Sequence, residues 1–449
     1  MNALQTAGKS FGHGIHPEDY KVMTRHLPIE RMPFMSEVVL PLSQHLGAPS
    51  VPLVKTGDKV YRGQLIAKAS GFVSVGLHAS VTGTVKSLDL RHHPSGKMVE
   101  SITIETDPFS PQTLYNEHQM LWEKLSVKEI LGIIQEAGFV GLGGAAFPTH
   151  VKLAIPEGKH ADCLIVNGVE CEPYLTSDHR LMLEHYDSMF NGIRIYQKIL
   201  NVSKVYIGIE LNKSDAIELL ARRVPEDLNC EVIPLKTKYP QGAEKMLIEA
   251  VLQKQVPSGK LPIDVHVVVN NVGTIAGIGD LFKFGQPLIE RIVTVTGPGI
   301  ERPANLMVPI GTRLVDVLDY CGGIKDNTRQ ILFGGPMMGS PQLHLDVPIM
   351  KGTSGILCLT DEQVGVREEY PCIRCLRCVD ACPVYLNPSR LGALAKIRNY
   401  EEMMDFHIID CVECGSCSYV CPSNIPLVQR FRVAKVLLRE KQARQKKAG

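Results

Sequence analysis

The N-terminal part of the chain alternates short apolar runs with turns that contain Gly and Asp. Runs of this length between turn signals predict β-strands. The expected strands lie within residues 38–40, 51–54, 64–67, 73–77, 83–85 and 101–105. Residues 12–34 are rich in Gly, His and Pro, and we expect an arm with little regular structure. Residues 1–107 therefore predict an N-terminal arm followed by a small β-rich domain.

The pattern changes after a polar linker at residues 108–119. Residues 126–137 carry apolar positions at helical spacing, with Ser126 as N-cap and Glu129 completing a capping box. Strand-like apolar runs then alternate with helical stretches. The strands are expected at 163–167, 204–209, 230–235 and 265–270, and the helices at 187–200, 214–223 and 245–252. This alternation predicts a doubly wound, Rossmann-like α/β domain over residues 108–290, within a multidomain α/β chain.

A glycine-rich loop follows the first predicted helix of this domain. It reads Gly141-Leu-Gly143-Gly144-Ala-Ala-Phe147-Pro148. A helix precedes this loop where the dinucleotide fingerprint needs a strand, and no Gly-Lys-Ser/Thr closes it as in a Walker A loop. The glycines allow close backbone approach, Pro148 suits a first helical turn, and Lys152 adds positive charge. The loop therefore favours a phosphate or flavin site.

Polar segments follow the predicted strands of the same domain. They are Asn167–Glu172, Tyr239–Glu244 and Asn270–Thr274. Doubly wound sheets bind ligands where the carboxyl ends of strands meet helix N-termini. We therefore expect these segments and the glycine loop to surround one site.

Eight of the thirteen cysteines form two matched runs near the C-terminus, each reading C-x2-C-x2-C-x3-C-P. This is the spacing with which bacterial ferredoxins ligate two 4Fe-4S clusters, the fourth cysteine of each run ligating the other cluster. The expected ligands of one cluster are Cys372, Cys375, Cys378 and Cys421. Those of the other are Cys382, Cys411, Cys414 and Cys417.

Zinc binding and disulfide formation are the two alternative uses of these cysteines. A zinc ribbon spends two CxxC pairs on one ion, and a disulfide framework belongs to small secreted chains. Both fit eight cysteines with a closing proline less well than a two-cluster, ferredoxin-type helical domain at residues 361–449.

Composition narrows the possible partners. Hydrophobic residues make up 44% and charged residues 21%, and the formal net charge is +1, which gives no electrostatic case for nucleic acid. No apolar run approaches the ~20 residues of a membrane-spanning helix, and no hydrophobic leader is expected. Cysteines of this kind suit the reducing cytoplasm. Residues 430–447 are basic and predict a solvated last helix, with a membrane-surface contact as the alternative.

The motifs of the α/β domain resemble the NADH-oxidising flavoprotein subunit of respiratory complex I. They are Gly-x-Gly-Gly-Ala-x-Phe-Pro-Thr-x-x-Lys, Glu-x-Glu-Pro, Tyr-x-x-Gly-x-Glu and Asn-Asn-Val-x-Thr. The resemblance implies FMN contacts from Gly141, Gly143, Gly144, Lys152, Asn167, Glu170, Tyr239, Gly242, Asn270, Asn271 and Thr274. It places NADH near Phe147, with Glu172, Glu244 and Lys260 around it. The chain departs from that family at Leu142, Ala146, Val169 and Ala243.

Two further segments resemble known modules. Gly57-Asp58-x-Val60-x-x-Gly63-Gln64, with the later Ala79–Val85, is similar to the barrel-sandwich hybrid of biotinyl and lipoyl domains, without their carrier lysine. Residues 291–360 resemble the soluble-ligand-binding β-grasp (SLBB) module that follows the flavin domain in complex I. The Gly334-Gly335-Pro336 segment within it is expected to be a turn.

The order of the four segments resembles the RnfC family of bacterial Rnf ion-translocating electron-transport complexes. This implies a peripheral subunit on the cytoplasmic face of the cell membrane, bound to other subunits of the complex. Its FMN exchanges hydride with NAD(H) and passes single electrons to two 4Fe-4S clusters. Ferredoxin is then an indirect partner, and the complex translocates Na⁺ or H⁺. The alternative is an iron–sulfur scaffold that binds neither flavin nor nucleotide.

Overall fold

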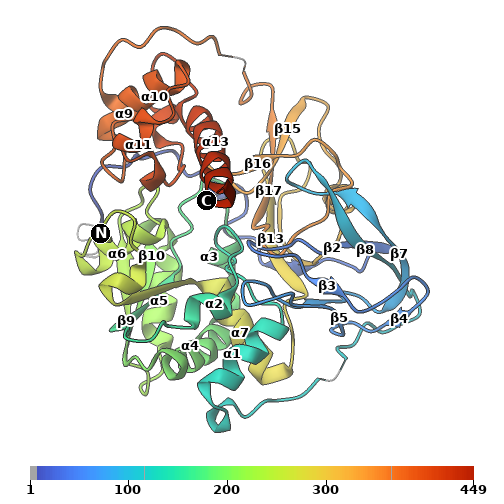
Figure 1. Ribbon diagram of the computed structural model, residues 1–449. Helices are drawn as coiled ribbons and strands as arrows, with labels where there is room; N and C mark the ends of the chain where they lie inside the picture. The colour runs from blue at the N-terminus through green and yellow to red at the C-terminus, as the bar shows by residue number, and fades with distance from the viewer. Residues whose placement is uncertain (1–7, 116, 366, 449) are drawn as a thin grey trace.

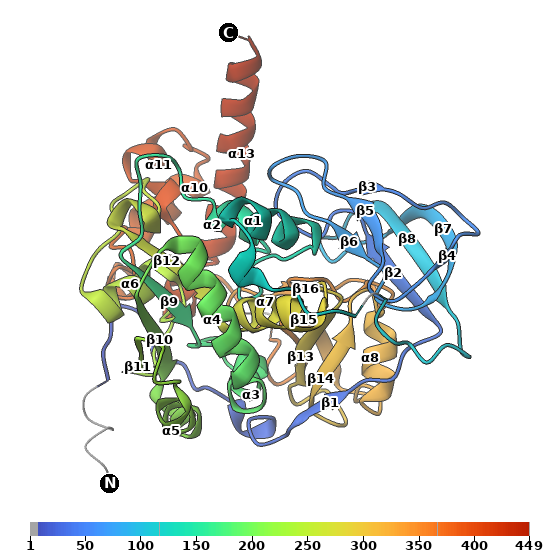
Figure 2. The same ribbon diagram turned by 90° about the horizontal axis from the view of Figure 1, so that it is seen from below.

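The structure is a computed structural model that describes residues 8–115, 117–365 and 367–448. Figure 1 shows the C-terminal helices packed against one end of the α/β domain, with two β-rich domains beside it. Figure 2, seen from below, shows the last helix projecting away from the body of the molecule. Four packed domains therefore make up the described chain.

The N-terminal β domain consists of two antiparallel sheets. One has the order β2 (Glu37–Pro41), β8 (Met98–Thr106), β7 (Gly83–His92) and β4 (Lys59–Val60). The other has the order β3 (Val51–Pro52), β5 (Leu65–Lys68) and β6 (Leu77–His78). The expected strands are present, but β7 is longer than predicted and β6 includes only the end of the predicted 73–77 run. Alternate residues such as Val38, Leu40, Ile102 and Ile104 fill the core.

A four-stranded parallel sheet forms the centre of the α/β domain. Its order is β11 (Cys230–Leu235), β10 (Lys204–Glu210), β9 (Cys163–Asn167) and β12 (Val267–Asn271). Leu164 and Val166 face the core with α4 (Tyr186–Leu200), α5 (Ser214–Arg223) and α7 (Val272–Phe284). Cys163 and Ile165 face α6 (Glu244–Leu252). Both faces are covered, as predicted for a doubly wound fold.

The strand order reverses between β9 and β12. The chain passes from β9 to β10 and β11 on one side, and β12 then pairs with the other side of β9, aligning Asn271 with Asn167. The connections after β9 and β12 therefore leave the sheet edge in opposite directions. This switch point is where open α/β sheets bind ligands.

The β-grasp domain has six strands, and its edge strand comes from the N-terminal arm. The order is β1 (Ile29–Arg31), β14 (Ala304–Pro309), β13 (Glu290–Thr296), β17 (Gly355–Thr360), β15 (Thr328–Phe333) and β16 (Ser340–Pro341). Helix α8 (Leu314–Tyr320) packs in the same core.

The expectation of an arm with little regular structure was wrong. The arm forms a 3₁₀ turn at Lys21–Met23, and β1 pairs in parallel with β14. Lys9 lies beside β11, and its backbone N donates to Pro234 O at 3.0 Å. Both β11 and β14 are edge strands with unpaired backbone groups, and the arm satisfies part of them.

Short helices surround the cysteine runs in the C-terminal domain. They are α9 (Arg377–Asp380), α10 (Pro388–Lys396), α11 (Glu402–Asp405), α12 (Ser416–Tyr419) and the long α13 (Leu427–Ala448). Cys382 follows α9 and Cys421 follows α12, so each fourth cysteine lies one short helix beyond its run. Across the described ranges, no helix combines the length and the apolar content needed to cross a membrane.

Candidate functional site

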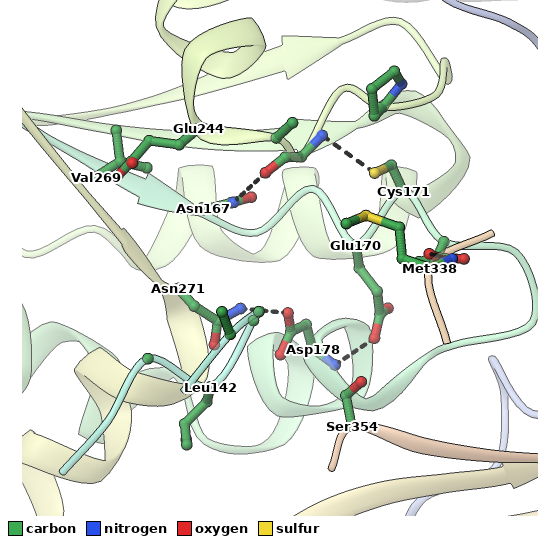
Figure 3. A pocket seen from close by; sticks show the side chains of 18 of the residues that line it. Leu142, Asn167, Glu170, Cys171, Asp178, Glu244, Val269, Asn271, Met338 and Ser354 are labelled. Atoms are coloured by element: carbon green, nitrogen blue, oxygen red, sulfur yellow. Dashed lines mark hydrogen bonds between the residues drawn. The ribbon is translucent and has the colours of Figure 1, made fainter. Parts of the chain in front are cut away.

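A cavity of about 410 Å³ opens at the switch point of the parallel sheet. This volume falls within the usual range for small-molecule sites. It is lined by every flavin- or NADH-contact residue named in the motifs except Thr274, with Lys260 also outside: Gly141, Gly143, Gly144, Phe147, Lys152, Asn167, Glu170, Glu172, Tyr239, Gly242, Glu244, Asn270 and Asn271. The structure therefore brings four separate segments of the sequence to one wall (Figure 3).

The glycine loop is closed on itself above β12. Gly141 N donates to Phe147 O at 2.8 Å. A Cβ on Gly143 would lie 2.7 Å from Asn271 Nδ2, so glycine is needed there. Thr274, expected at the cavity, is fully buried behind it, and its hydroxyl accepts a hydrogen bond from Leu142 N at 2.9 Å. Thr274 lies in the first turn of α7 and holds the loop from behind.

The helix after the glycine loop is short. Helix α2 spans only Thr149–Leu153, and Lys152 on it forms an ion pair with Glu244 at the start of α6. Lys152 and Glu244 both line the cavity, and their side chains are partly exposed. The expected positive charge thus comes from this lysine beside a carboxylate. Lys260 is exposed and lies outside the cavity wall.

Two carboxylates meet at the N-terminus of α3 (Ser177–Glu184). Glu170 accepts hydrogen bonds from Asp178 N at 2.8 Å and His179 N at 3.2 Å, which satisfies free amides of the helix. Asp178 itself accepts a bond from Asn271 Nδ2 at 2.6 Å (Figure 3). Burial raises the pKa of the Asp178 carboxyl to about 7. Asp178 was missed from the sequence because an acidic residue in a first helical turn is usual without any site.

Glu172 joins the α/β domain to the β-grasp domain. Its carboxylate accepts hydrogen bonds from Met337 N at 3.1 Å and Met338 N at 2.8 Å, in the turn between β15 and β16. Burial raises the pKa of this carboxyl to about 7. A Cβ on Gly335 would lie 2.3 Å from Glu172 Oε2. The Gly334-Gly335-Pro336 segment is a turn, as expected, and it completes the cavity wall through Met338.

The wall offers groups that a flavin needs. Asn270 is 4% exposed, and its Nδ2 has no hydrogen-bond partner among the described residues. A buried donor without a partner is costly unless a ligand or water accepts from it. Phe147 is 39% exposed and offers an aromatic face, and Gly144 has open space around its Cα. A planar polar ring with a phosphate fits this combination of donors, glycines and a lysine.

The cysteines line two cavities in the crossed combination expected from their spacing. Cys372, Cys375, Cys378 and Cys421 line a cavity of about 300 Å³. Cys382, Cys411, Cys414 and Cys417 line a smaller one. We call these sets the outer and the inner cysteines. Each takes three residues from one run and the fourth from the other.

The thiol geometry bears on the two alternative uses. All thirteen cysteines are free. In the described chain, no three of their sulfurs lie within 4.8 Å of one another, whereas one tetrahedral zinc with Zn–S bonds of about 2.3 Å would bring four within roughly 3.8 Å. Burial raises the pKa of the Cys378 and Cys411 thiols to about 11, so a metal must replace their protons at neutral pH. The wider spacing fits a cluster of several metal ions.

The two sets differ in exposure and in position. Cys382, Cys414 and Cys417 are buried, whereas Cys372 and Cys375 are exposed. Cys414 also lines the 410 Å³ cavity, together with its neighbour Val412. The inner set therefore borders the candidate flavin site and the outer set faces solvent.

Four family models match this chain in succession. They are the RnfC barrel sandwich hybrid domain at residues 9–108, the Nuo51 FMN-binding domain at 134–280, the SLBB domain at 292–341 and the 4Fe-4S dicluster domain at 371–425. The fold class expected from the sequence is thereby confirmed, and so are an FMN-binding and a two-cluster domain.

Curated relatives match over nearly the whole length. The chain is 48% identical to the RnfC-type subunit of the proton-translocating ferredoxin:NAD(+) oxidoreductase complex of Clostridium ljungdahlii, covering 95% of this chain and 93% of that one. It is 44% identical to the Na(+)-translocating counterpart of Acetobacterium woodii, covering 95% and 96%. The chain belongs to the RnfC family. A further family member, from the ion-translocating oxidoreductase complex of Rhodobacter capsulatus, is 42% identical over 96% of this chain and 83% of its own.

A solved structure aligns with part of the chain. The NAD+-reducing [NiFe]-hydrogenase in its air-oxidized state aligns with a TM-score of 0.49 and 18% identity, covering 69% of this chain and 63% of that chain. For this RnfC-family chain, the residues that line the flavin-type cavity and the two cysteine cavities are the candidates for cofactor binding.

Proposed function

We propose that this chain is the peripheral electron-transfer subunit of a membrane-bound ferredoxin:NAD oxidoreductase that couples electron flow to translocation of Na⁺ or H⁺. Its relatives in Clostridium ljungdahlii and Acetobacterium woodii belong to complexes named for these activities, which supports the proposal. The observation that carries it is the position of Cys414, which lies on the wall of both the flavin-type cavity and the inner cysteine cavity.

The cavity at the switch point is the proposed FMN site. The glycine loop, Lys152 and Asn270 hold the cofactor, while Asn167 fixes the opposite wall by donating to Gly242 O at 2.9 Å. When bound, FMN exchanges a hydride with NAD(H) and single electrons with a cluster. Phe147 is placed to stack against the nicotinamide, and Glu244 with Lys152 forms the neighbouring wall. Glu172 acts from the β-grasp side by keeping the turn at Met337 and Met338 in place.

The inner and outer cysteines each hold one 4Fe-4S cluster in this proposal. The inner set borders the FMN site and the outer set is exposed, so electrons pass between FMN and the surface through the inner set first. Ile373 and Leu376, in the loop between the outer cysteines, are 68% and 54% exposed. This loop is where a redox partner within the complex docks. We place the chain at the cytoplasmic face of the membrane, with domains at 1–107, 108–290, 291–360 and 361–449.

The departures from the complex I motifs leave the backbone of the site intact. Leu142 N donates to Thr274, and Leu142 O accepts from Arg291 Nη2 at 2.8 Å. Val169 O accepts from Lys213 Nζ at 2.7 Å. Leu142 and Val169 act through main-chain atoms that any residue supplies. This favours an FMN-binding enzyme subunit over the scaffold alternative.

The proposal is tested on the purified, anaerobically reconstituted chain. We expect about one FMN and about eight irons per chain, and bleaching of the flavin absorbance when NADH is added. Iron at that level without FMN binding and without reduction by NADH would favour the scaffold and contradict the enzyme.

A further inference from the structure

The N-terminal arm places a buried lysine directly behind one wall of the flavin-type cavity. Lys21 is 2% exposed, and its Nζ donates to Glu170 O at 3.0 Å, to Glu172 O at 2.9 Å and to Leu175 O. An ammonium has three N–H donors, so these carbonyls use all of them. A residue from the arm therefore holds the segment that carries Glu170, Cys171 and Glu172 along the cavity.

The arm is fixed in register at this point. Tyr174 N donates to Asp19 O at 2.8 Å, and the rings of Tyr20 and Tyr174 stack with centroids 4.8 Å apart. Asp19 also accepts a hydrogen bond from Asn212 Nδ2 at 3.0 Å. These contacts on both sides of Lys21 fix the backbone from which its side chain reaches the loop.

A second buried lysine acts on the preceding peptide. Lys213 is fully buried, and its Nζ donates to Val169 O at 2.7 Å and pairs with Glu210 at 3.3 Å. Burial lowers the pKa of the Lys21 ammonium, while the charge of Glu170 opposes that effect. Because Glu210 already pairs with Lys213, Lys21 is the cation that balances Glu170 behind this wall.

The direction of the carbonyls fixes the direction of the amides. In a trans peptide, the C=O of one residue and the N–H of the next point in opposite directions. The carbonyls of Val169 and Glu170 point at the two lysines, so the amides of Glu170 and Cys171 point away from them. Both residues line the cavity, and Glu170 has a positive φ of 44°. Successive amides around a left-handed residue form an anion-binding nest.

We propose that Lys21 is a positioning residue that turns the Glu170 and Cys171 amides toward the flavin and raises its midpoint potential. Hydride transfer from NADH to FMN yields NAD⁺ and a reduced flavin that carries one negative charge on its ring. Oriented amides and a cation behind them stabilise that charge relative to the oxidised ring. The inference rests on the proposed FMN site, and it assigns a redox role to an arm that lies outside the matched FMN-binding domain at residues 134–280.

Three variants of the full, cluster-loaded chain test this role. Lys21→Met removes charge and donors. Lys21→Gln removes the charge but keeps two N–H donors for the loop carbonyls. Lys9→Met is the control, because Lys9 anchors the same arm through Val251 O at 3.0 Å and makes no bond to this loop. Iron content and circular dichroism establish that each variant is folded.

The measurements are FMN dissociation by fluorescence and the flavin midpoint potential by dye-coupled titration. We expect Lys21→Met to weaken FMN binding about tenfold. Lys21→Gln should weaken binding less. The potential should become more negative in both Lys21 variants and stay unchanged in Lys9→Met. If Lys21→Met does not fold, Lys21→Gln supplies the same comparison of potentials.

The outcomes separate this inference from the proposed function. A wild-type chain that binds no FMN contradicts the proposed function itself. FMN binding by the wild type with an unchanged flavin potential in folded Lys21→Gln and Lys21→Met overturns only the role of Lys21, even if affinity falls. A shift of equal size in Lys9→Met also overturns it, because the effect then belongs to anchoring of the arm in general.

Discussion

The Tyr239 hydroxyl donates a hydrogen bond of 2.8 Å to the backbone oxygen of Cys414. Both residues line the flavin-type cavity, and Tyr239 is only 1% exposed. The bond ties the α/β domain to the loop that carries three of the inner cysteines. It therefore fixes how the candidate flavin site and the inner cysteine set lie relative to each other.

Replacing Tyr239 by phenylalanine tests this link. The ring stays, but Cys414 O loses its buried donor, at a cost of about 1 kcal/mol. We expect flavin reduction by NADH to stay near its normal rate and cluster reduction to slow several-fold, measured by anaerobic stopped-flow absorbance. Tyr206→Phe, on β10 outside the cavity wall, is the matched control. Equal cluster reduction in Tyr239→Phe and the wild type would refute the role of this bond.

The crossed cysteine sets predict which spectra change when one cysteine is lost. Cys382→Ala should damage the cluster of the second run, and Cys421→Ala the cluster of the first, as read from the EPR signals of the reduced protein. Cys230→Ala should leave both signals intact, because Cys230 lies on β11 away from both sets. Loss of only the first-run signal in Cys382→Ala would show that the ligands are not crossed.

Gly335→Ala should undock the β-grasp turn from the cavity. The added methyl would lie 2.3 Å from Glu172 Oε2, so the carboxylate or the turn must move. We expect a loss of about 1–3 kcal/mol of stability and slower transfer between flavin and clusters. Gly71→Ala, with open space around its Cα, controls for the substitution itself. Thermal unfolding and stopped-flow rates that match the control would contradict this prediction.

A buried lysine makes stability depend on pH at the meeting point of three domains. Lys351 Nζ donates to Gly76 O at 2.8 Å and Gly138 O at 2.7 Å, and burial lowers its pKa to about 7. Between pH 7 and its unfolded value of 10.5, the unfolded chain holds a proton on this group that the folded chain lacks. Stability from this group therefore rises with pH in that window and is lost as pH falls toward 7.

Lys351→Met should remove this dependence. We expect the wild type to gain roughly 1–2 kcal/mol over the variant between pH 7 and pH 9, measured from denaturant unfolding. The exposed Lys55→Met should keep the wild-type slope. A variant that follows the wild-type slope would show that Lys351 does not titrate in this range.

The parts of the fold that depend on local pattern were predictable. Strands β9 and β11 and helix α5 have the predicted bounds, because buried apolar runs and amphipathic spacing mark them directly. The switch-point residues followed from the same pattern, since parallel strands bring their carboxyl ends to one edge. Asn167, Asn270 and Asn271 therefore lie on one wall, as expected.

The features that depend on contacts between domains were not predictable. Strand β1 exists because β14 offers a free edge more than two hundred and fifty positions later, and three residues carry no pattern of their own. Glu172 could be assigned to the cavity, but its bonds to Met337 and Met338 come from another domain. Lys21 looks like an ordinary surface lysine in the sequence, and only the loop from Glu170 to Leu175 gives it a role.

The order of electron transfer is the central claim, and two cysteine variants test it directly. Cys417→Ala removes an inner ligand and Cys375→Ala an outer one. After rapid mixing with NADH, freeze-quench EPR should show the inner cluster reduced in Cys375→Ala. It should show the outer cluster still oxidised in Cys417→Ala although the flavin is reduced. Fast reduction of the outer cluster in Cys417→Ala would contradict the path from flavin through the inner cysteines to the surface.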